Sequence, residues 1–412
     1  MLLQGVPPTR ILSESHRAMT DIALRGSSLT PNRDHLLTMS DVYNEQRALS
    51  RAALGSRDDA SAVSERVAEL SATDHNPILL YKPQGSGTCR LHEELRSSSS
   101  AICDGLDAPR FMLALQTVAQ RQLWELYGST NAILDTTHGT NQYGFKLTSL
   151  MVIDDDAQGQ VVAWLVSDRE DATAMTSFLQ CIRSISAVRP SHVITDDSHS
   201  AAPSIRHVFP DAQHLVCHWH IDRAWRKAVY ARCPKGPEGM LIAVKVYQTV
   251  RALLELDSER DFDKSVDIAM AAITQVAPTF AEYFRSTYLG SRDRIRQWAS
   301  FARDHTRTNT SNAAESFHNT FKTFFLHRMG KRRVDDLLEQ LFAFERHQYH
   351  KGQVRHLLQH RQRFDRAIDA LKRRGEQIPS EHIRDEDDTH LQVCACTSQT
   401  HSIQLTRSHD TQ

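Results

Sequence analysis

The sequence lacks an excess of either charge. Its 412 residues include 49 Lys and Arg against 50 Asp and Glu, which gives a formal net charge of -1 at pH 7. This balance argues against a protein that is basic throughout and that binds nucleic acid through its global charge. Any contact with nucleic acid must therefore come from local basic patches.

Long apolar runs are also missing. No window approaches the ~20 apolar residues that a membrane helix needs, and the opening MLLQGVPPTR has no continuous apolar stretch. We therefore expect neither a secretory signal nor a membrane span. With 40% hydrophobic and 24% charged residues, the sequence has a globular composition and enough length for two or three domains.

Cysteine is sparse and forms no framework. Seven cysteines are an odd number without regular spacing, which favours a reducing compartment, nucleus or cytoplasm, over a disulfide scaffold. The sequence also shows no internal repeat and no long low-complexity tract. Its N-terminal part contains no recognisable zinc-binding or helix-turn-helix motif for reading DNA.

The N-terminal region is expected to be mainly helical. Over residues 1 to about 75, Leu, Val and Ala recur at three- and four-residue spacings, which predicts two or three helices. An extended segment is expected over 74–88, and SSSSAICDGLDAP reads as a boundary loop. We therefore assign residues 1–108 to this region.

The pattern changes after residue 109. Residues 111–128 predict an amphipathic helix that ends at Gly128. Three apolar runs in a meander, followed by alternating helices and strands, favour an α/β fold. This order matches a ribonuclease H-like core over 109–220, with a mixed sheet flanked by helices. The expected strands are 132–135, 147–154, 161–166, 192–195 and 214–217, and the expected helices are 171–187 and 198–208.

The rest of the sequence is mostly helical in pattern. Residues 221–305 predict a helical insertion, most clearly in LIAVKVYQTVRALLEL. Residues 306–375 are expected to hold the last core helix, from about Asn312 to Leu326, and a basic helical extension. Residues 376–412 form a tail.

Two acids follow predicted strands directly. Asp135 and Asp196 come at the carboxyl ends of their strands, and such ends converge on one edge of an α/β sheet. Phosphoryl transfer by two divalent ions needs hard oxygen ligands at such a place. Glu315 is a third candidate, although Asn312-x-x-Glu315 also has the spacing of a helix capping box. Each acid, taken singly, also fits a structural role.

The motifs in their order resemble the transposases of Mutator-like elements, the MULE family. The resemblance runs from about Phe111 to Glu339 and rests on ILDTTHGTNQYGFKL, VITDDSHSAAPSIRHVFPDAQHLVCHWH and NTSNAAESFHNTFK. It implies a DDE triad of Asp135, Asp196 and Glu315 that uses Mg²⁺ or Mn²⁺, with Asp197 as a solvated neighbour. It also implies DNA partners, namely transposon ends and target DNA, and a nuclear location. A homo-oligomer is an open alternative.

Cys217 and His220 have C-x-x-H spacing. Two ligands do not complete a zinc site, so metal binding and packing of a buried Cys beside a hydrogen-bonded His both stay open. The same pair is similar to a signature of the MULE family. At the other end of the chain, Cys394, Cys396 and His401 resemble the opening of a SWIM-type zinc finger, but no second Cys and His pair follows. A truncated finger and an accidental match are both open.

A basic cluster follows Glu315. Residues 316–375 contain 14 Lys and Arg against 6 Asp and Glu, a local excess of 8. Such a run is often a solvated helix face, but beside catalytic acids it also suits contacts with DNA phosphates. The predicted contacts are Lys322, Arg328, Lys331, Arg332 and Arg333.

Three functions fit these observations. The preferred one is a transposase that cleaves and transfers DNA strands. The second is a domesticated or decayed relative that binds DNA or protein without catalysis. The third is an unrelated helical scaffold, which requires the three acids to lie more than ~10 Å apart, because a two-metal site cannot span that distance.

Overall fold

The computed structural model describes most of the chain between residues 58 and 357. The described residues are 10–17, 37–38, 41–42, 44–45, 58–197, 200–303, 312–327, 332–357, 383–387, 390–394 and 400–404. They fall into two units. The first comprises Met1–Asp154 with Gln158–Gln348, and the second comprises Asp155–Ala157 with Tyr349–Gln412.

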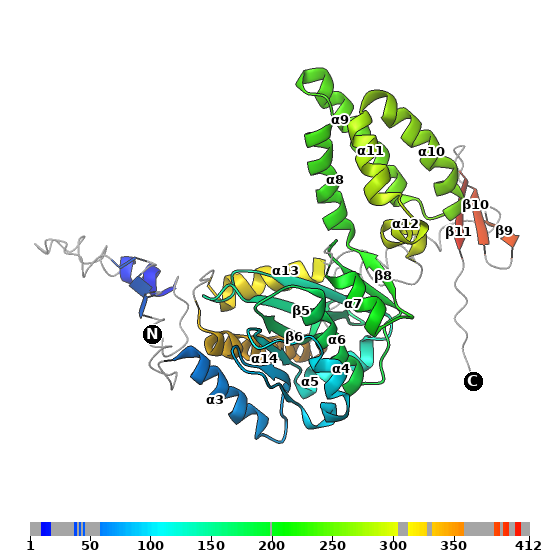
Figure 1. Ribbon diagram of the computed structural model, residues 1–412. Helices are drawn as coiled ribbons and strands as arrows, with labels where there is room; N and C mark the ends of the chain where they lie inside the picture. The colour runs from blue at the N-terminus through cyan, green and yellow to red at the C-terminus, as the bar shows by residue number, and fades with distance from the viewer. Residues whose placement is uncertain are drawn as a thin grey trace, which may run out of the picture. The chain divides into compact units, whose positions relative to one another are not determined.

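A mixed sheet organises the first unit (Figure 1). Within the described residues it has eight strands in the order β2-β1-β3-β6-β5-β4-β7-β8. β4, β7 and β8 are parallel to one another, and every other neighbouring pair is antiparallel. The predicted α/β class is confirmed. The strands are β1 (Ile78–Lys82), β2 (Arg90–Leu91), β3 (Met112–Leu115), β4 (Asn131–Thr137), β5 (Lys146–Ile153), β6 (Gly159–Ser167), β7 (His192–Thr195) and β8 (Gln213–Val216).

The helix predicted over 111–128 is wrong in its first part. Met112–Leu115 form β3, and the helix α5 begins only at Val118 and ends at Tyr127. All four residues of β3 are buried between β1 and β6, so both faces are apolar and the pattern shows no strand alternation. Thr117 and Gln120 then form a capping box that starts the helix.

The region 1–108, expected to be mainly helical, contributes two strands to the same sheet, and β1 falls within the extended segment expected over 74–88. β1 and β2 come from it, and β1 pairs with β3. It also contains α3 (Asp59–Ser71), η3 (Glu93–Ser98) and α4 (Ser99–Cys103). Most of the helical pattern expected before residue 58 lies outside the described residues.

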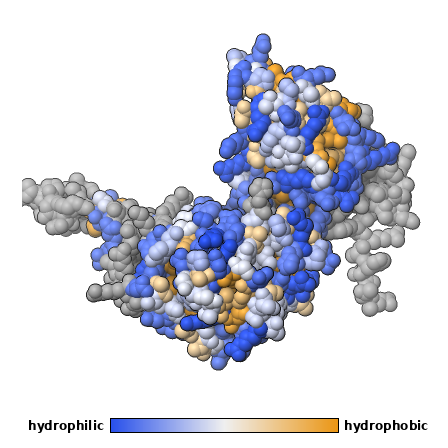
Figure 2. Space-filling view, in the orientation of Figure 1, coloured by the Kyte–Doolittle hydropathy of each residue, from blue (hydrophilic) through white to orange (hydrophobic). Residues whose placement is uncertain are grey.

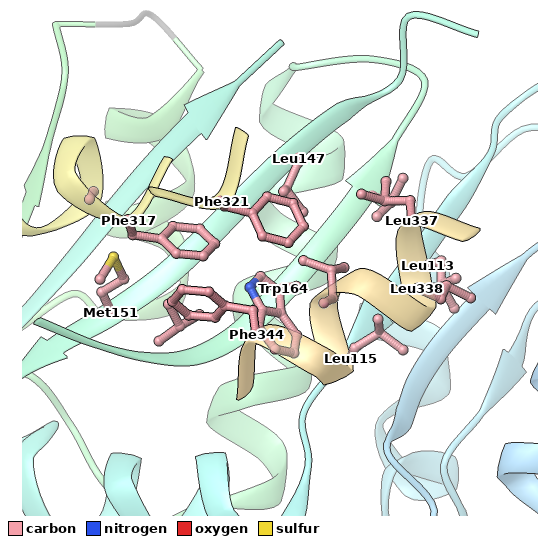
Figure 3. Close-up of a cluster of buried hydrophobic side chains, with 14 of the residues drawn as sticks. Leu113, Leu115, Leu147, Met151, Trp164, Phe317, Phe321, Leu337, Leu338 and Phe344 are labelled. Atoms are coloured by element: carbon pink, nitrogen blue, oxygen red, sulfur yellow. The ribbon is translucent and has the colours of Figure 1, made fainter. Parts of the chain in front are cut away.

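Helices cover both faces of the sheet. One face carries α4, α5, α6 (Ala172–Ile185) and α7 (Ala201–Val208), whose apolar side chains form one core cluster with the strands. The other face carries α3, α13 (Asn312–Thr320), a π-helical turn η5 (Phe321–Phe325) and the first part of α14 (Val334–Leu357). Figure 3 shows Phe317, Phe321 and Phe344 from these helices packed around Trp164 of β6.

Residues 218–302 form a helical segment with a core of its own. It follows β8 directly, and its buried centre is aromatic: Trp225 contacts Phe284, Tyr288 and Trp298 edge to face, with ring centroids 5.2, 5.5 and 5.3 Å away. Hydrophobic patches are visible on this segment in Figure 2, and its exposed hydrophobic side chains include Met240, Leu241 and Ile268. The elements are α8 (His218–Arg232), α9 (Gly236–Glu255), α10 (Glu259–Val276), α11 (Pro278–Tyr288), α12 (Arg292–Trp298) and η4 (Ser300–Ala302).

The second unit contains an antiparallel sheet in the order β11-β10-β9. Its strands are β9 (Ile383–Asp387), β10 (His390–Cys394) and β11 (Thr400–Gln404). Cys394 ends β10 and His401 lies in β11, paired with Val393. Cys396 lies outside the described residues, so the SWIM-like reading stays a prediction.

We expect Trp225→Ala to lower the free energy of unfolding by about 3–5 kcal/mol, because it opens a cavity among buried rings. Leu241→Ala, at a side chain that is 66% exposed, should change it by less than about 0.5 kcal/mol. Chemical denaturation monitored by circular dichroism measures both. Equal effects of the two substitutions would contradict an aromatic core in this segment.

Candidate active site

Asp135 lies in β4, and Asp196 directly follows the neighbouring parallel strand β7. β4 and β7 pair in the register Leu134 with Thr195, so one residue further along lie Asp135 and Asp196. Neighbouring strands are about 4.8 Å apart, which brings the two acids side by side. Asp196 follows β7 as predicted, whereas Asp135 lies inside β4, which continues to Thr137.

The alternation along both strands directs the two acids toward the same face. Ile133 and Ile194 belong to the core cluster on the side of α13. Asp135 and Asp196 each come two residues later, and strand residues two apart share a face. Asp135 is 7% exposed, so it lies at the inner edge of this face.

Glu315 lies in the first turn of α13, above the same face of the sheet. Burial raises the pKa of its carboxyl group, and the charge of Asp135 raises it further. His220 and Arg223 act in the opposite direction on this pKa. The helix thus brings the third predicted acid into electrostatic contact with the first.

His318 attaches α13 to the central strand. Its Nδ1 atom lies 3.2 Å from Oδ2 of Asp135, and its Nε2 atom lies 3.5 Å from Oγ of Ser149 on β5. Glu315 is one turn earlier on the same helix, so the two side chains share a stripe. A carboxylate has two oxygens, so the bond to Oδ2 leaves Oδ1 of Asp135 able to accept from another partner.

Glu170 is a fourth acid at this edge, and the sequence reasoning missed it. Burial raises the pKa of its carboxyl group, and the charges of Asp196 and Asp135 raise it further. His138 lies beside it, with Nε2 3.6 Å from Oε2. In the sequence, Glu170 is part of Asp-Arg-Glu-Asp, which resembles a solvated loop. The sequence feature that could have identified Glu170 is its position just after β6. The carboxyl end of β6 lies at the same edge of the sheet as the carboxyl end of β4.

Cationic groups border the four acids. Burial lowers the pKa of Lys322, while the charge of Asp135 opposes this shift. Burial also lowers the pKa of His138, and the charges of Lys146 and Lys322 lower it further. Among the predicted phosphate contacts that the structure describes, Lys322 is therefore the one that interacts electrostatically with a candidate acid, Asp135.

The other predicted DNA contacts lie elsewhere or have other partners. Arg332 is 6% exposed, binds Asp336 at 2.6 Å and donates to the carbonyl of Phe325. Arg333 binds Asp335 at 2.9 Å. Arg328 and Lys331 are outside the described residues.

Asp197 is not simply solvated. Its carboxylate forms an ion pair with Arg294 of α12, with a distance of 2.7 Å. This ion pair gives Asp197 a structural role that differs from the role predicted for its neighbour Asp196.

Cys217 and His220 interact with each other. Cys217 is buried at the start of α8. Burial opposes protonation of His220, but a hydrogen bond with Cys217 and the charges of Asp135 and Asp196 raise its pKa overall. This arrangement fits the packing role, and it places His220 beside the acids.

The donor set suits a hard divalent cation. Four carboxylates face one edge of the sheet, and carboxylate oxygens are the ligands that Mg²⁺ and Mn²⁺ prefer. In the part of the chain that the structure describes, however, no three His, Cys, Asp or Glu side chains are grouped closely enough to hold an ion. The chemistry fits the metal, and the side chains would have to draw together to bind it.

Comparison with known families supports the predicted resemblance. The family model of the MULE transposase domain matches residues 132–224, a segment that contains Asp135, Asp196, Cys217 and His220. The predicted resemblance is thereby confirmed: residues 132–224 match the MULE transposase domain, which supports a transposase-related function and an interaction with DNA. Glu315 lies beyond the matched segment. No curated protein matches the chain.

None of the helices in the described ranges is long and apolar enough to cross a membrane.

We expect Glu170→Gln to stabilise the protein at neutral pH. The folded state raises the pKa of Glu170 above its ordinary 4.5, because the protein favours the uncharged form of this side chain. The stability gained from that preference is fully present below pH 4.5, and it is lost as the pH rises through the raised pKa and the carboxyl group ionises. A neutral Gln avoids this loss. The melting temperature of the variant should equal that of the wild type near pH 4 and exceed it at pH 7 to 8.

The control is Glu282→Gln, at an exposed carboxylate of α11, which should show no such divergence with pH. A gap between Glu170→Gln and wild type that narrows as the pH rises would contradict the crowding of acids at this edge.

Proposed function

We propose that the chain is a DDE-type transposase that cleaves DNA strands and joins them to target DNA with Asp135, Asp196 and Glu315. The observation that carries the proposal is the register of β4 and β7, which sets the two Asp residues side by side, with Glu315 in electrostatic contact with Asp135. The matched MULE domain spans both Asp residues and supports a transposase-related function.

The strand order supports a ribonuclease H-like core. Strands β6-β5-β4 form an antiparallel meander, and β7 and β8 then add in parallel to β4. This is the order expected from the sequence for such a core. β3, β1 and β2 extend the sheet on the side away from β8.

Asp135, Asp196 and Glu315 are the residues that would hold Mg²⁺ or Mn²⁺ ions. When bound, such ions activate an attacking oxygen and stabilise the leaving oxygen of a phosphodiester. The reaction is an in-line displacement, first by water at the element end and then by the freed 3'-OH on target DNA. Both steps use the same site.

The remaining side chains would prepare this site. The contact from His318 orients Asp135, and the partial burial of Glu315 keeps the helix acid at the edge of the site. Lys322 lies where a cation attracts the phosphate of a bound strand, in electrostatic contact with Asp135. DNA substrates of this kind would place the protein in the nucleus.

The second candidate, a DNA- or protein-binding relative without catalysis, has less support. All three acids are present, and the pKa of Glu315 is raised by its burial and by the charge of Asp135, so this acid is kept beside its partner at the expense of stability. The third hypothesis, an unrelated helical scaffold, requires the three acids to lie far apart. The neighbouring positions of Asp135 and Asp196 do not fit this requirement.

We expect Asp135→Asn and Glu315→Gln each to reduce strand cleavage by on the order of 100-fold or more, since removing even an outer-shell partner of a metal ligand costs 10- to 100-fold. The assay is nicking of a plasmid that carries the terminal repeats flanking the coding sequence, in Mg²⁺ or Mn²⁺ and in EDTA. Asp267→Asn, at an exposed carboxylate of α10, is the matched control. Cleavage that survives Asp135→Asn would overturn the proposed triad.

A further inference from the structure

Trp219 differs from every other tryptophan in the chain. The sequence contains five, and Trp124, Trp164, Trp225 and Trp298 are each 0% exposed. Trp219 is 38% exposed. A single exposed apolar side chain needs no explanation by itself. Its neighbours give this one a specific setting.

Trp219 borders the acid cluster. It is the second residue of α8, and its ring meets the ring of His220 edge to face, with centroids 4.9 Å apart at 90°. His220 interacts electrostatically with both Asp135 and Asp196. The indole is therefore one residue away from a side chain that is in electrostatic contact with two of the proposed catalytic acids.

Arg223 completes the surface. It lies one turn further along α8, and its guanidinium carbon is 5.3 Å from the centroid of the Trp219 ring. Its charge also acts on Glu315. The guanidinium over the exposed ring thus also interacts electrostatically with the third acid.

This combination suits an unpaired nucleobase. Bases stack on aromatic side chains with little dependence on sequence, and arginine contributes both a cation over the ring and a contact to phosphate. A base inside a duplex has both faces covered by its neighbours, so a protein ring can stack only on a base that has left the helix.

We propose that Trp219 stacks on an unpaired base of the DNA substrate, next to the phosphate that enters the acid cluster, while Arg223 contacts the adjoining phosphate. The inference rests on the proposed function for the location of that phosphate. It places the base on the ring face opposite to Arg223.

Affinity for DNA with and without unpaired bases tests the proposal. The full chain is titrated, in EDTA so that no strand is cut, with a blunt duplex and with the same duplex carrying a three-nucleotide single-stranded 3' end. Trp219→Ala should weaken binding of the tailed duplex by roughly 5- to 150-fold, the range expected for losing one stacked base, and leave the blunt duplex unchanged. Tyr230→Ala, at a 63% exposed ring further along α8, is the control and should change neither.

Trp219→Phe keeps a stacking ring and serves if the alanine variant does not fold. It should retain most of the affinity for the tailed duplex, but the quenching of tryptophan fluorescence by that DNA should disappear, because the other four tryptophans are buried. Quenching that persists in Trp219→Phe, or equal losses on both duplexes in Trp219→Ala, would overturn the stacking role. Unchanged DNA binding with loss of self-association would overturn it in favour of a protein contact.

Arg223→Gln should weaken both duplexes and reduce the slope of log affinity against log salt by about one contact. An unchanged slope would overturn the phosphate contact. These binding and fluorescence measurements do not require DNA cleavage. If Trp219 stacks on the tailed duplex but the protein does not nick DNA, the proposed catalysis is wrong and the stacking is not. An active Trp219→Ala with unaltered affinity contradicts the stacking alone.

Discussion

The parallel pairing of β4 with β7 is the constraint on which the site depends. A shift of one residue would turn Asp196 to the opposite face and separate it from Asp135. The register is held by apolar residues on both faces: Ile133 and Ile194 pack toward α13, and Leu134 and Val193 pack toward α6 and α7. The core that fills both faces of the sheet therefore also fixes the separation of the two acids.

Glu170 and Glu315 cost stability at the sheet edge, as their raised pKa values indicate. Apolar side chains on the other side of α13 and of the turn that follows it hold Glu315 in place. Phe317 and Phe321 anchor this segment in the core, with ring centroids 5.6 Å apart. Glu315, His318 and Lys322 follow the three- and four-residue spacing of one stripe along the same segment. Packing of the two phenylalanines thus fixes the position of Glu315, His318 and Lys322 relative to the edge of the sheet. The penalty appears as the raised pKa values of Glu170 and Glu315.

Sequence reasoning proposed Asp135, Asp196 and Glu315 because each follows or opens a predicted element, and such positions can be read from local patterns, although Asp135 lies inside β4. It failed at Met112–Leu115, where burial on both faces removed the alternation that distinguishes a strand from a helix. It also missed Glu170, since the approach of β6 to β4 depends on pairing between strands and not on neighbours in sequence. Arg332 was predicted to contact DNA because it lies in a basic run of the sequence. That run did not reveal that its side chain forms a buried ion pair with Asp336.

Helix α8 belongs to two environments at once. Its first turns carry Trp219, His220 and Arg223 at the acid cluster, and Trp225, less than one turn beyond Arg223, is the centre of the aromatic core of the helical segment. A helix transmits rotation along its axis as a stiff rod, so the aromatic core fixes the angular setting of the side chains that border the acids. A substitution in that aromatic core would therefore change the orientation of the side chains that border the acids, without any substitution among those side chains themselves.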